Sequence, residues 1–206
     1  MKKIILPLFA ALTLVACRKT NSAEETQSLD VAEKNMSVVA KRTAAWCGPC
    51  GSSGFPAFSQ METDFEGQAV FMAWKDALAE ANRVGDELFD EVGPKFEIGN
   101  SVPTFFTNFK KERASQSILD DHKNAPVVAN SNYSFSVSGN KVNLKTTTKF
   151  FQDVDGDYVV APYMIVDGIK GYQNGHADGN ETIHHKYVAG VAKPTTTSVS
   201  KNWGYT

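Results

Sequence analysis

The stretch Trp46-Cys47-Gly48-Pro49-Cys50 contains two cysteines separated by two residues. Such a pair can close a small disulfide and can equally exist as a dithiol. If a helix begins at Cys47, its sulfur faces unpaired backbone N–H groups and the positive end of the helix dipole, which stabilise a thiolate. Gly48 permits a tight turn, and Pro49 suits a first helical turn because its missing N–H is not needed there. We therefore predict that Cys47 is the nucleophile and that Cys50 lies behind it.

Two other uses of the cysteine pair remain open: one half of a zinc site, and a purely structural disulfide. The sequence has no second CxxC motif, and its four histidines all lie far downstream, which disfavours zinc. We expect neither a metal ion nor a cofactor.

The WCGPC stretch resembles the active-site motif of the thioredoxin superfamily, and a second stretch, Val102-Pro103-Thr104, strengthens the resemblance. In thioredoxins a cis-proline that follows an aliphatic residue and precedes a threonine begins a strand beside the CxxC motif. A cis proline exposes the preceding backbone, which can pair with an extended substrate chain. An ordinary trans proline at a strand start is the alternative. The resemblance implies catalytic cysteines at 47 and 50 and the following supporting residues: Trp46, Gly48, Pro49, Val102, Pro103 and Thr104.

Residues 36–125 are expected to form one α/β thioredoxin-like domain, a mixed sheet flanked by helices. Phe58, Met61 and Phe65 fall on one helical face, Pro56 should kink that helix, and Gly67 should close it. The other expected elements are a short strand over 36–41, a strand covered on both faces over 69–74, and a helix over about 78–92.

Lys41 departs from the thioredoxin pattern, because thioredoxins usually carry a buried acid six residues before the first cysteine. Either the register is shifted, or the role of the acid passes to water or to another group. A lysine cation near the sulfurs would favour the thiolate and make the disulfide more oxidising. We favour the alternative, in which the side chain extends to solvent at the end of the strand.

The N-terminal residues have the pattern of an export signal. Met1-Lys2-Lys3 is followed by an apolar run from Ile4 to Ala16 that is too short to span a membrane. The run ends at Leu14-Val15-Ala16-Cys17, which resembles a bacterial lipobox and implies lipidation of Cys17; an ordinary cleaved signal is the alternative. The chain has three cysteines, so a lipidated Cys17 leaves one redox pair and no stray thiol.

The predicted protein is therefore an exported bacterial lipoprotein, with residues 1–17 as the signal peptide and residues 18–35 as a polar tether. Arg18, rather than aspartate, follows the lipid cysteine and favours the outer membrane, on its periplasmic or surface face. The formal net charge of −2, with both signs interspersed, argues against a nucleic-acid surface. The membrane contact is expected through the lipid alone.

Residues 126–206 show an alternating pattern and are expected to form a smaller, antiparallel, sandwich-like β-domain that is minimal or incomplete. A hairpin turns at residues 138–140, an acidic turn at 153–157 reads as a plain turn rather than a calcium loop, and a strand follows over 158–166. Residues 174–180 are expected to form an exposed loop. Metal binding by His176, Asp178, His184 and His185 is the alternative to solvated loop residues, which we favour because adjacent histidines point to opposite sides of a strand.

The lipobox, the thioredoxin-like stretch, the β-rich region and the run Tyr172-Gln173-Asn174 together resemble the outer-membrane-protein-28-related lipoproteins. The expected function is extracytoplasmic thiol–disulfide exchange with protein disulfide or dithiol substrates and with a membrane or periplasmic thiol redox partner. The alternative is a non-enzymatic surface lipoprotein that uses a thioredoxin-like scaffold and its β-domain to bind a partner.

Overall fold

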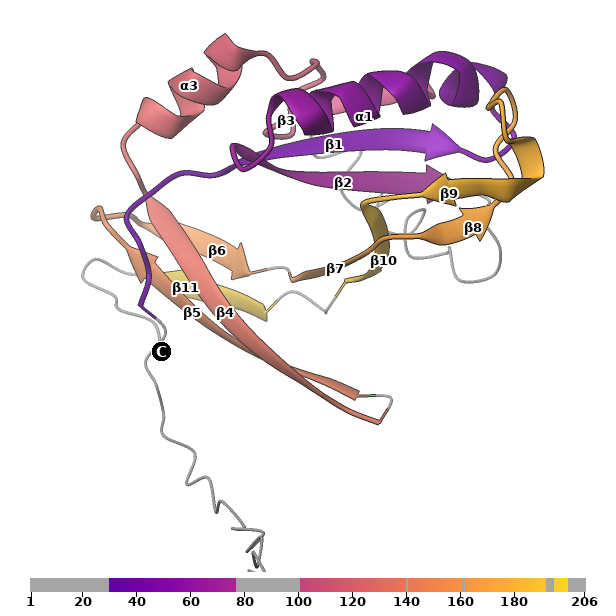
Figure 1. Cartoon of the computed structure of the whole chain (residues 1–206). Coiled ribbons are helices and arrows are strands. Elements are labelled where there is room, and N and C mark those ends of the chain that lie inside the picture. The colour runs from indigo at the N-terminus through magenta and orange to yellow at the C-terminus, as the bar shows by residue number, and fades with distance from the viewer. Residues whose placement is uncertain (1–29, 77–100, 140, 161, 192–194, 200–206) are drawn as a thin grey trace, which may run out of the picture.

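The structure is a computed structural model of the 206-residue chain, and it describes residues 30–76, 101–139, 141–160, 162–191 and 195–199 (Figure 1). Its centre is a mixed five-stranded sheet with the order β3-β1-β2-β10-β7. These strands are β1 (Ser37–Ala44), β2 (Ala69–Asp76), β3 (Thr104–Thr107), β7 (Tyr163–Val166) and β10 (Tyr187–Val191). The expected helix over 78–92 and the lipobox at Cys17 lie outside the described residues.

Strands β1 and β2 are parallel along their whole lengths, from Ser37 opposite Ala69 to Ala44 opposite Asp76. Strand β3 pairs with the other edge of β1 in the antiparallel direction. Val39 of β1 is fully buried, and Phe71, Met72 and Trp74 of β2 are buried as well. The predicted covered strands are therefore confirmed, because a strand with neighbours on both edges and apolar layers on both faces carries a continuous apolar run.

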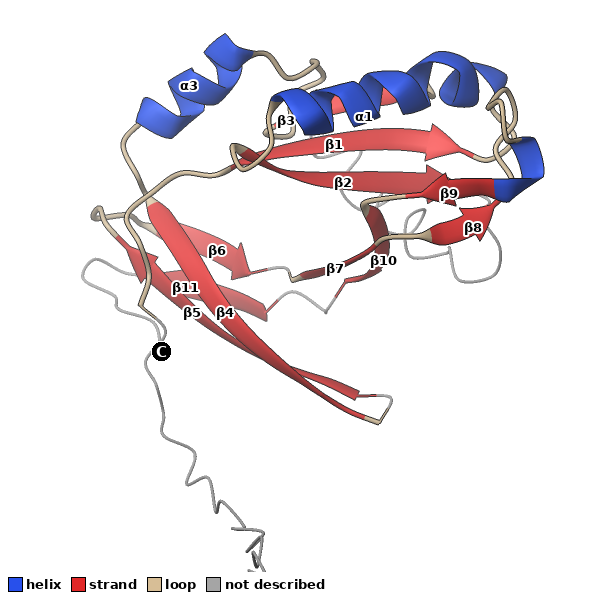
Figure 2. Cartoon of the chain, in the orientation of Figure 1, coloured by secondary structure: helices blue, strands red, loops and turns tan. Residues whose placement is uncertain are grey.

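The helix that follows the cysteine pair has two parts, a π-helical turn η1 (Cys50–Gly54) and α1 (Phe55–Asp64) (Figure 2). The Phe55 N–H reaches back to the Cys50 carbonyl, and Pro56 has no N–H to offer to the turn before it. Phe58 and Met61 are buried against the sheet, and Phe65 packs beside them. The predicted apolar face is thus confirmed, and the helix gives way to a turn in which Gly67 takes a φ of 72°.

The helix α3 (Gln116–Asn124) was not predicted from the sequence. The Ser115 hydroxyl oxygen accepts from the Ile118 N–H and caps its first turn. Leu119 is its one buried residue, so the apolar periodicity that would reveal a helix is weak.

The predicted hairpin consists of β4 (Ala129–Ser138) and β5 (Lys141–Phe150), paired from Ala129–Phe150 to Ser138–Lys141. In the view of Figure 1 the hairpin lies away from α1, below β7 and β10. Two further two-stranded antiparallel sheets pair β6 (Gly156–Val160) with β11 (Thr195–Val199), and β8 (Ile169–Gly171) with β9 (Thr182–His184).

The predicted strand over 158–166 is divided in the structure. Strand β6 ends at Val160 and β7 begins at Tyr163, with Pro162 between them. Proline offers no N–H to a ladder, so the chain leaves one sheet and enters another at this point. Strands β7 and β10 then extend the central sheet, so that sheet crosses the domain boundary expected at residues 125–126. The division into domains itself stays a prediction.

Within the described ranges, none of the helices has the length and apolar character that a membrane crossing requires.

Candidate active site at the cysteine pair

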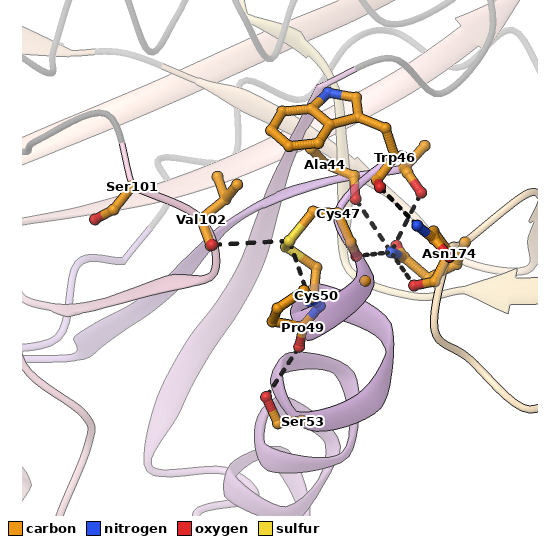
Figure 3. The surroundings of a disulfide bond; sticks show 12 residues. Ala44, Trp46, Cys47, Pro49, Cys50, Ser53, Ser101, Val102 and Asn174 are labelled. Carbon is orange, nitrogen blue, oxygen red and sulfur yellow. Dashed lines mark hydrogen bonds between the residues drawn. A yellow bond between two sulfur atoms is a disulfide. The ribbon is translucent and has the colours of Figure 1, made fainter.

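Cys47 and Cys50 form a disulfide whose Cα atoms are 5.2 Å apart. Helical structure begins immediately after Cys47, as predicted. The Cys50 N–H donates to Cys47 Sγ at 3.1 Å, so a backbone donor at the start of the helix points at the expected nucleophile (Figure 3). Such a donor and the helix dipole stabilise a thiolate on this sulfur.

Both cysteines of the pair are buried residues. Cys47 is 4% exposed and Cys50 is 1% exposed, and both pack against Ala44 and the half-buried Val102. Trp46 is 59% exposed beside them, so the motif reaches the surface through its first residue. Pro49 is exposed on the first helical turn, and its carbonyl accepts from the Ser53 hydroxyl at 2.9 Å. Both cysteines are thus largely covered, and Cys47 is the slightly more exposed residue of the pair.

The stretch from Val102 to Thr104 lies beside the disulfide. The Val102–Pro103 peptide bond is cis, as the resemblance implied. The Val102 carbonyl oxygen lies 3.7 Å from Cys47 Sγ (Figure 3), and in the dithiol form the Cys47 thiol can donate to it. A Cβ on Gly54 would come within 3.0 Å of Pro103, so the helix and the proline are in close contact. The two motifs noted in the sequence therefore meet in space.

Sequence reasoning missed the residue that ties the motif to the C-terminal half of the chain. Gln173 is 2% exposed, and its Nε2 lies 3.1 Å from both the Ala44 and the Cys47 carbonyl oxygens. These contacts bridge residues 126 to 129 positions apart. The run Tyr172-Gln173-Asn174 was noted only as part of a resemblance, and its polar character gave no signal of burial.

The prediction that residues 174–180 form an exposed loop is confirmed for most of these residues, but the start of the loop also contacts the cysteine motif. Asn174 is exposed, but its Nδ2 donates to the Trp46 carbonyl at 2.9 Å and its backbone N–H donates to the Ala45 carbonyl at 2.8 Å. A Cβ on Gly175, which has a φ of 78°, would collide with the Gly48 backbone. The start of this loop is therefore both exposed to solvent and in contact with the cysteine motif.

The expectation of solvated histidines is wrong for two of the three in this region. His184 is buried, and the side chain of His176 is largely covered, with its ring 4.6 Å from that of Phe55. His185 is exposed, as expected for the neighbour of a buried strand residue. Among the described residues, no group of three His, Cys, Asp or Glu side chains is placed to hold a metal ion.

Lys41 does not extend to solvent, which corrects the favoured interpretation. Its side chain lies between β1 and α1, with Nζ 5.0 Å from the ring centroid of Phe55 and 4.5 Å from that of Phe58. The residue is only 5% exposed. Burial lowers the pKa of Lys41 to about 7, and the Glu62 carboxylate opposes this shift. The basic position before the cysteines therefore holds a buried amine that titrates near neutral pH.

Gly51→Ala is expected to destabilise the protein by about 1–3 kcal/mol, because the new Cβ would come within 3.0 Å of the Asn174 carbonyl oxygen and the His176 nitrogen. Both are backbone atoms that cannot move away cheaply. Gly48→Ala is the matched control, since its Cβ would meet only Asn174 Nδ2 at 3.8 Å. Denaturant unfolding of the two variants checks this, and equal midpoints would contradict the close packing.

No protein-family model matches the chain, and no curated protein matches it. The chain is similar in structure to HBP35 of Porphyromonas gingivalis, a thioredoxin-fold-like protein, with a TM-score of 0.59 and 17% sequence identity. The similarity covers 79% of this chain and 58% of that one, so the chain spans little more than half the length of HBP35. At this identity the likeness concerns the fold alone. The chain thus has a thioredoxin-like fold that carries a CxxC disulfide.

Proposed function

We propose that this protein is an extracytoplasmic thiol–disulfide oxidoreductase that exchanges disulfides with protein substrates through Cys47 and Cys50. The observation that carries the proposal is the contact of the Cys50 N–H with Cys47 Sγ at the start of a helix. A structural disulfide needs no donor aimed at one of its sulfurs. A reactive cysteine does, because the donor stabilises the thiolate that attacks and later leaves.

In the reducing direction, the Cys47 thiolate attacks one sulfur of a substrate disulfide. A bond forms between Cys47 Sγ and that sulfur, and the other substrate sulfur leaves as a thiolate. Cys50 then loses its proton and attacks Cys47 Sγ, which closes the Cys47–Cys50 disulfide and releases the second substrate thiolate. The substrate gains two electrons and the protein loses two. Oxidation of a substrate dithiol is the same sequence in reverse.

The substrate is proposed to be an extended polypeptide. The backbone of Val102, next to the cis proline, lies beside Cys47 Sγ and is placed to pair with such a chain. A membrane or periplasmic thiol protein is the proposed redox partner that resets the pair after each turnover.

The location is also part of the proposal. The lipobox-like run that ends at Cys17 and the likeness to outer-membrane-protein-28-related lipoproteins support an exported protein anchored by lipid, on the outer membrane. An oxidising compartment is where a disulfide such as Cys47–Cys50 persists.

The equilibrium reduction potential of the Cys47–Cys50 pair tests the proposed chemistry. A value near about −270 mV is expected for a reductant that draws on a donor, and about −180 to −120 mV for an isomerase or oxidant. A value well below about −300 mV would mark a structural bond and would contradict the proposal.

A second candidate function is the binding of a partner by the β4–β5 hairpin. One face of the hairpin is apolar and 41–65% exposed, made of Tyr133, Phe135, Val137, Val142 and Leu144. Phe135 lies opposite Leu144 and Val137 opposite Val142, so these side chains share one face. Exposed apolar surface of this kind often marks an interaction site.

A photo-crosslinking residue at position 135 is expected to form a covalent adduct in cells, whereas the same residue at position 134 is not. Ser134 is the matched control because it lies on the polar face of the same strand, opposite Lys145. Adduct masses on a denaturing gel are the measurement. Equal labelling at the two positions, or none at either, would exclude the hairpin face as a binding site.

A further inference from the structure

Gln173 is a buried polar side chain that the exchange reaction described above does not use. It follows β8, and its backbone N–H donates to the Gly179 carbonyl at 3.0 Å, which fixes its position in the turn before β9. From there its side chain reaches the cysteine motif, where it is almost fully enclosed. Its carboxamide nitrogen lies within hydrogen-bond distance of carbonyl oxygens of the cysteine motif as well as of the neighbouring Asn174 carbonyl.

The surroundings of Gln173 Nε2 consist of acceptors. The Ala44 and Cys47 carbonyl oxygens lie at 3.1 Å, the Asn174 carbonyl at 3.2 Å and the Ala45 carbonyl at 3.5 Å. Carbonyl oxygens only accept, so the amide nitrogen and not the amide oxygen must face them. The side chain therefore acts as a donor toward both ends of the stretch that leads into the disulfide.

Asn174 completes this set of donors. Its backbone N–H donates to the Ala45 carbonyl, and its side-chain amide donates to the Trp46 carbonyl. The carbonyls of four consecutive residues, 44 to 47, thus all accept from Gln173 or Asn174. Such donors hold the negative ends of these peptide dipoles in fixed directions, next to the sulfur that must carry a negative charge.

We propose that Gln173 is a positioning residue of the redox site. By donating to the carbonyls of Ala44 and Cys47 it holds Cys47 Sγ over the N–H of Cys50 and beside the Val102 carbonyl, and so sets the reactivity of the Cys47 thiolate. This inference rests on the proposed thiol–disulfide exchange. It assigns to the C-terminal half of the chain a direct part in tuning the cysteine pair.

The test compares Gln173→Glu and Gln173→Met in the full-length protein with the wild type. The glutamate keeps the shape but replaces the donor with an acceptor, and the methionine keeps the length without any donor. Gln152→Glu and Gln152→Met are the matched controls, because the exposed Gln152 donates to the Val127 carbonyl at 3.1 Å, away from the motif. The reduced proteins are alkylated with iodoacetamide across a pH range, which gives the thiol pKa of Cys47, and unfolding by denaturant is measured in parallel.

Both Gln173 variants are expected to show a Cys47 thiol pKa about one unit higher and therefore to alkylate several-fold more slowly at neutral pH, while the Gln152 variants match the wild type. Lower stability with an unchanged alkylation profile would show a purely structural role and would overturn the inference. If neither Gln173 variant folds, the same alkylation measurement is made on Asn174→Ala. This exposed side chain donates to the Trp46 carbonyl within the same stretch of the motif. A drop of about threefold supports the inference, and an unchanged rate overturns it.

The outcome separates this inference from the proposed function. A wild-type Cys47 with an ordinary thiol pKa near about 8.5 and no exchange with small disulfides would defeat both. A reactive wild type whose rate is unaffected by the Gln173 substitutions would defeat the positioning role and leave the exchange function standing.

Discussion

Cys50→Ser protein grown in cells is expected to carry a covalently linked partner, whereas Cys47→Ser protein is expected to carry none and to lose all exchange activity. Cys47 is the slightly more exposed residue of the pair, and its Sγ accepts from the Cys50 N–H. It therefore forms the mixed disulfide, and without Cys50 no thiolate is in place to resolve it. Non-reducing gels of both variants, followed by reduction, give the measurement.

The double variant Cys47→Ser/Cys50→Ser is the control for capture by other means, including the third cysteine, Cys17. It should show the same bands as Cys47→Ser. Adducts on Cys47→Ser but not on Cys50→Ser would reverse the assignment of attacking and resolving cysteines. Their absence from both single variants would favour a structural disulfide.

Lys41→Met is expected to stabilise the protein at pH 6 by about 1–4 kcal/mol and to remove a rise in stability at higher pH. In the folded protein burial lowers the pKa of Lys41 from 10.5 to about 7. Between these two values the unfolded chain binds the proton and the folded chain does not. The free energy of unfolding of the wild type therefore increases with pH in this window, by at most about 1.4 kcal/mol per pH unit. Below pH 7 both states hold the proton, and this contribution is constant.

Denaturant unfolding at pH 6, 7.5 and 9 checks the expectation. Lys149→Met is the matched control, because the exposed Lys149 lies over the Phe151 ring at 4.9 Å, in the same kind of contact without burial. Its effect should stay within about 0.5 kcal/mol at every pH. If the rise between pH 7.5 and 9 persists in Lys41→Met, it comes from another group, and the buried amine has an ordinary pKa.

The same variant bears on the direction of electron flow. If the Lys41 cation acts on the cysteine thiolate, its removal should shift the reduction potential of the pair to a more negative value below pH 7 and leave it unchanged above. Redox titration of Lys41→Met and the wild type at pH 6 and pH 9 measures this. An equal potential at pH 6 would confine Lys41 to a role in stability.

Local sequence patterns predicted the helix start at Cys47, the two buried strands and the hairpin. Each of these depends on residues close together in the chain: two cysteines with a glycine and a proline between them, a continuous apolar run, or strict alternation around a turn. The cis proline after Val102 came from the resemblance to thioredoxins, and the structure places it beside the sulfur. Helix α3 was missed because it buries only one residue, Leu119.

The sequence by itself determined the chemistry that is available, namely a cysteine pair at a helix start beside the Val102–Pro103 turn. Only the tertiary structure decided what surrounds that pair. Whether a lysine such as Lys41 reaches solvent depends on the helix packed over it, and periodicity within one strand carries no information on that helix. Gln173 meets Cys47 across 126 positions of chain, because β7 and β10 bring the C-terminal half back to the central sheet. Contacts of this kind follow from how the strands are ordered in space, which no short stretch of sequence encodes.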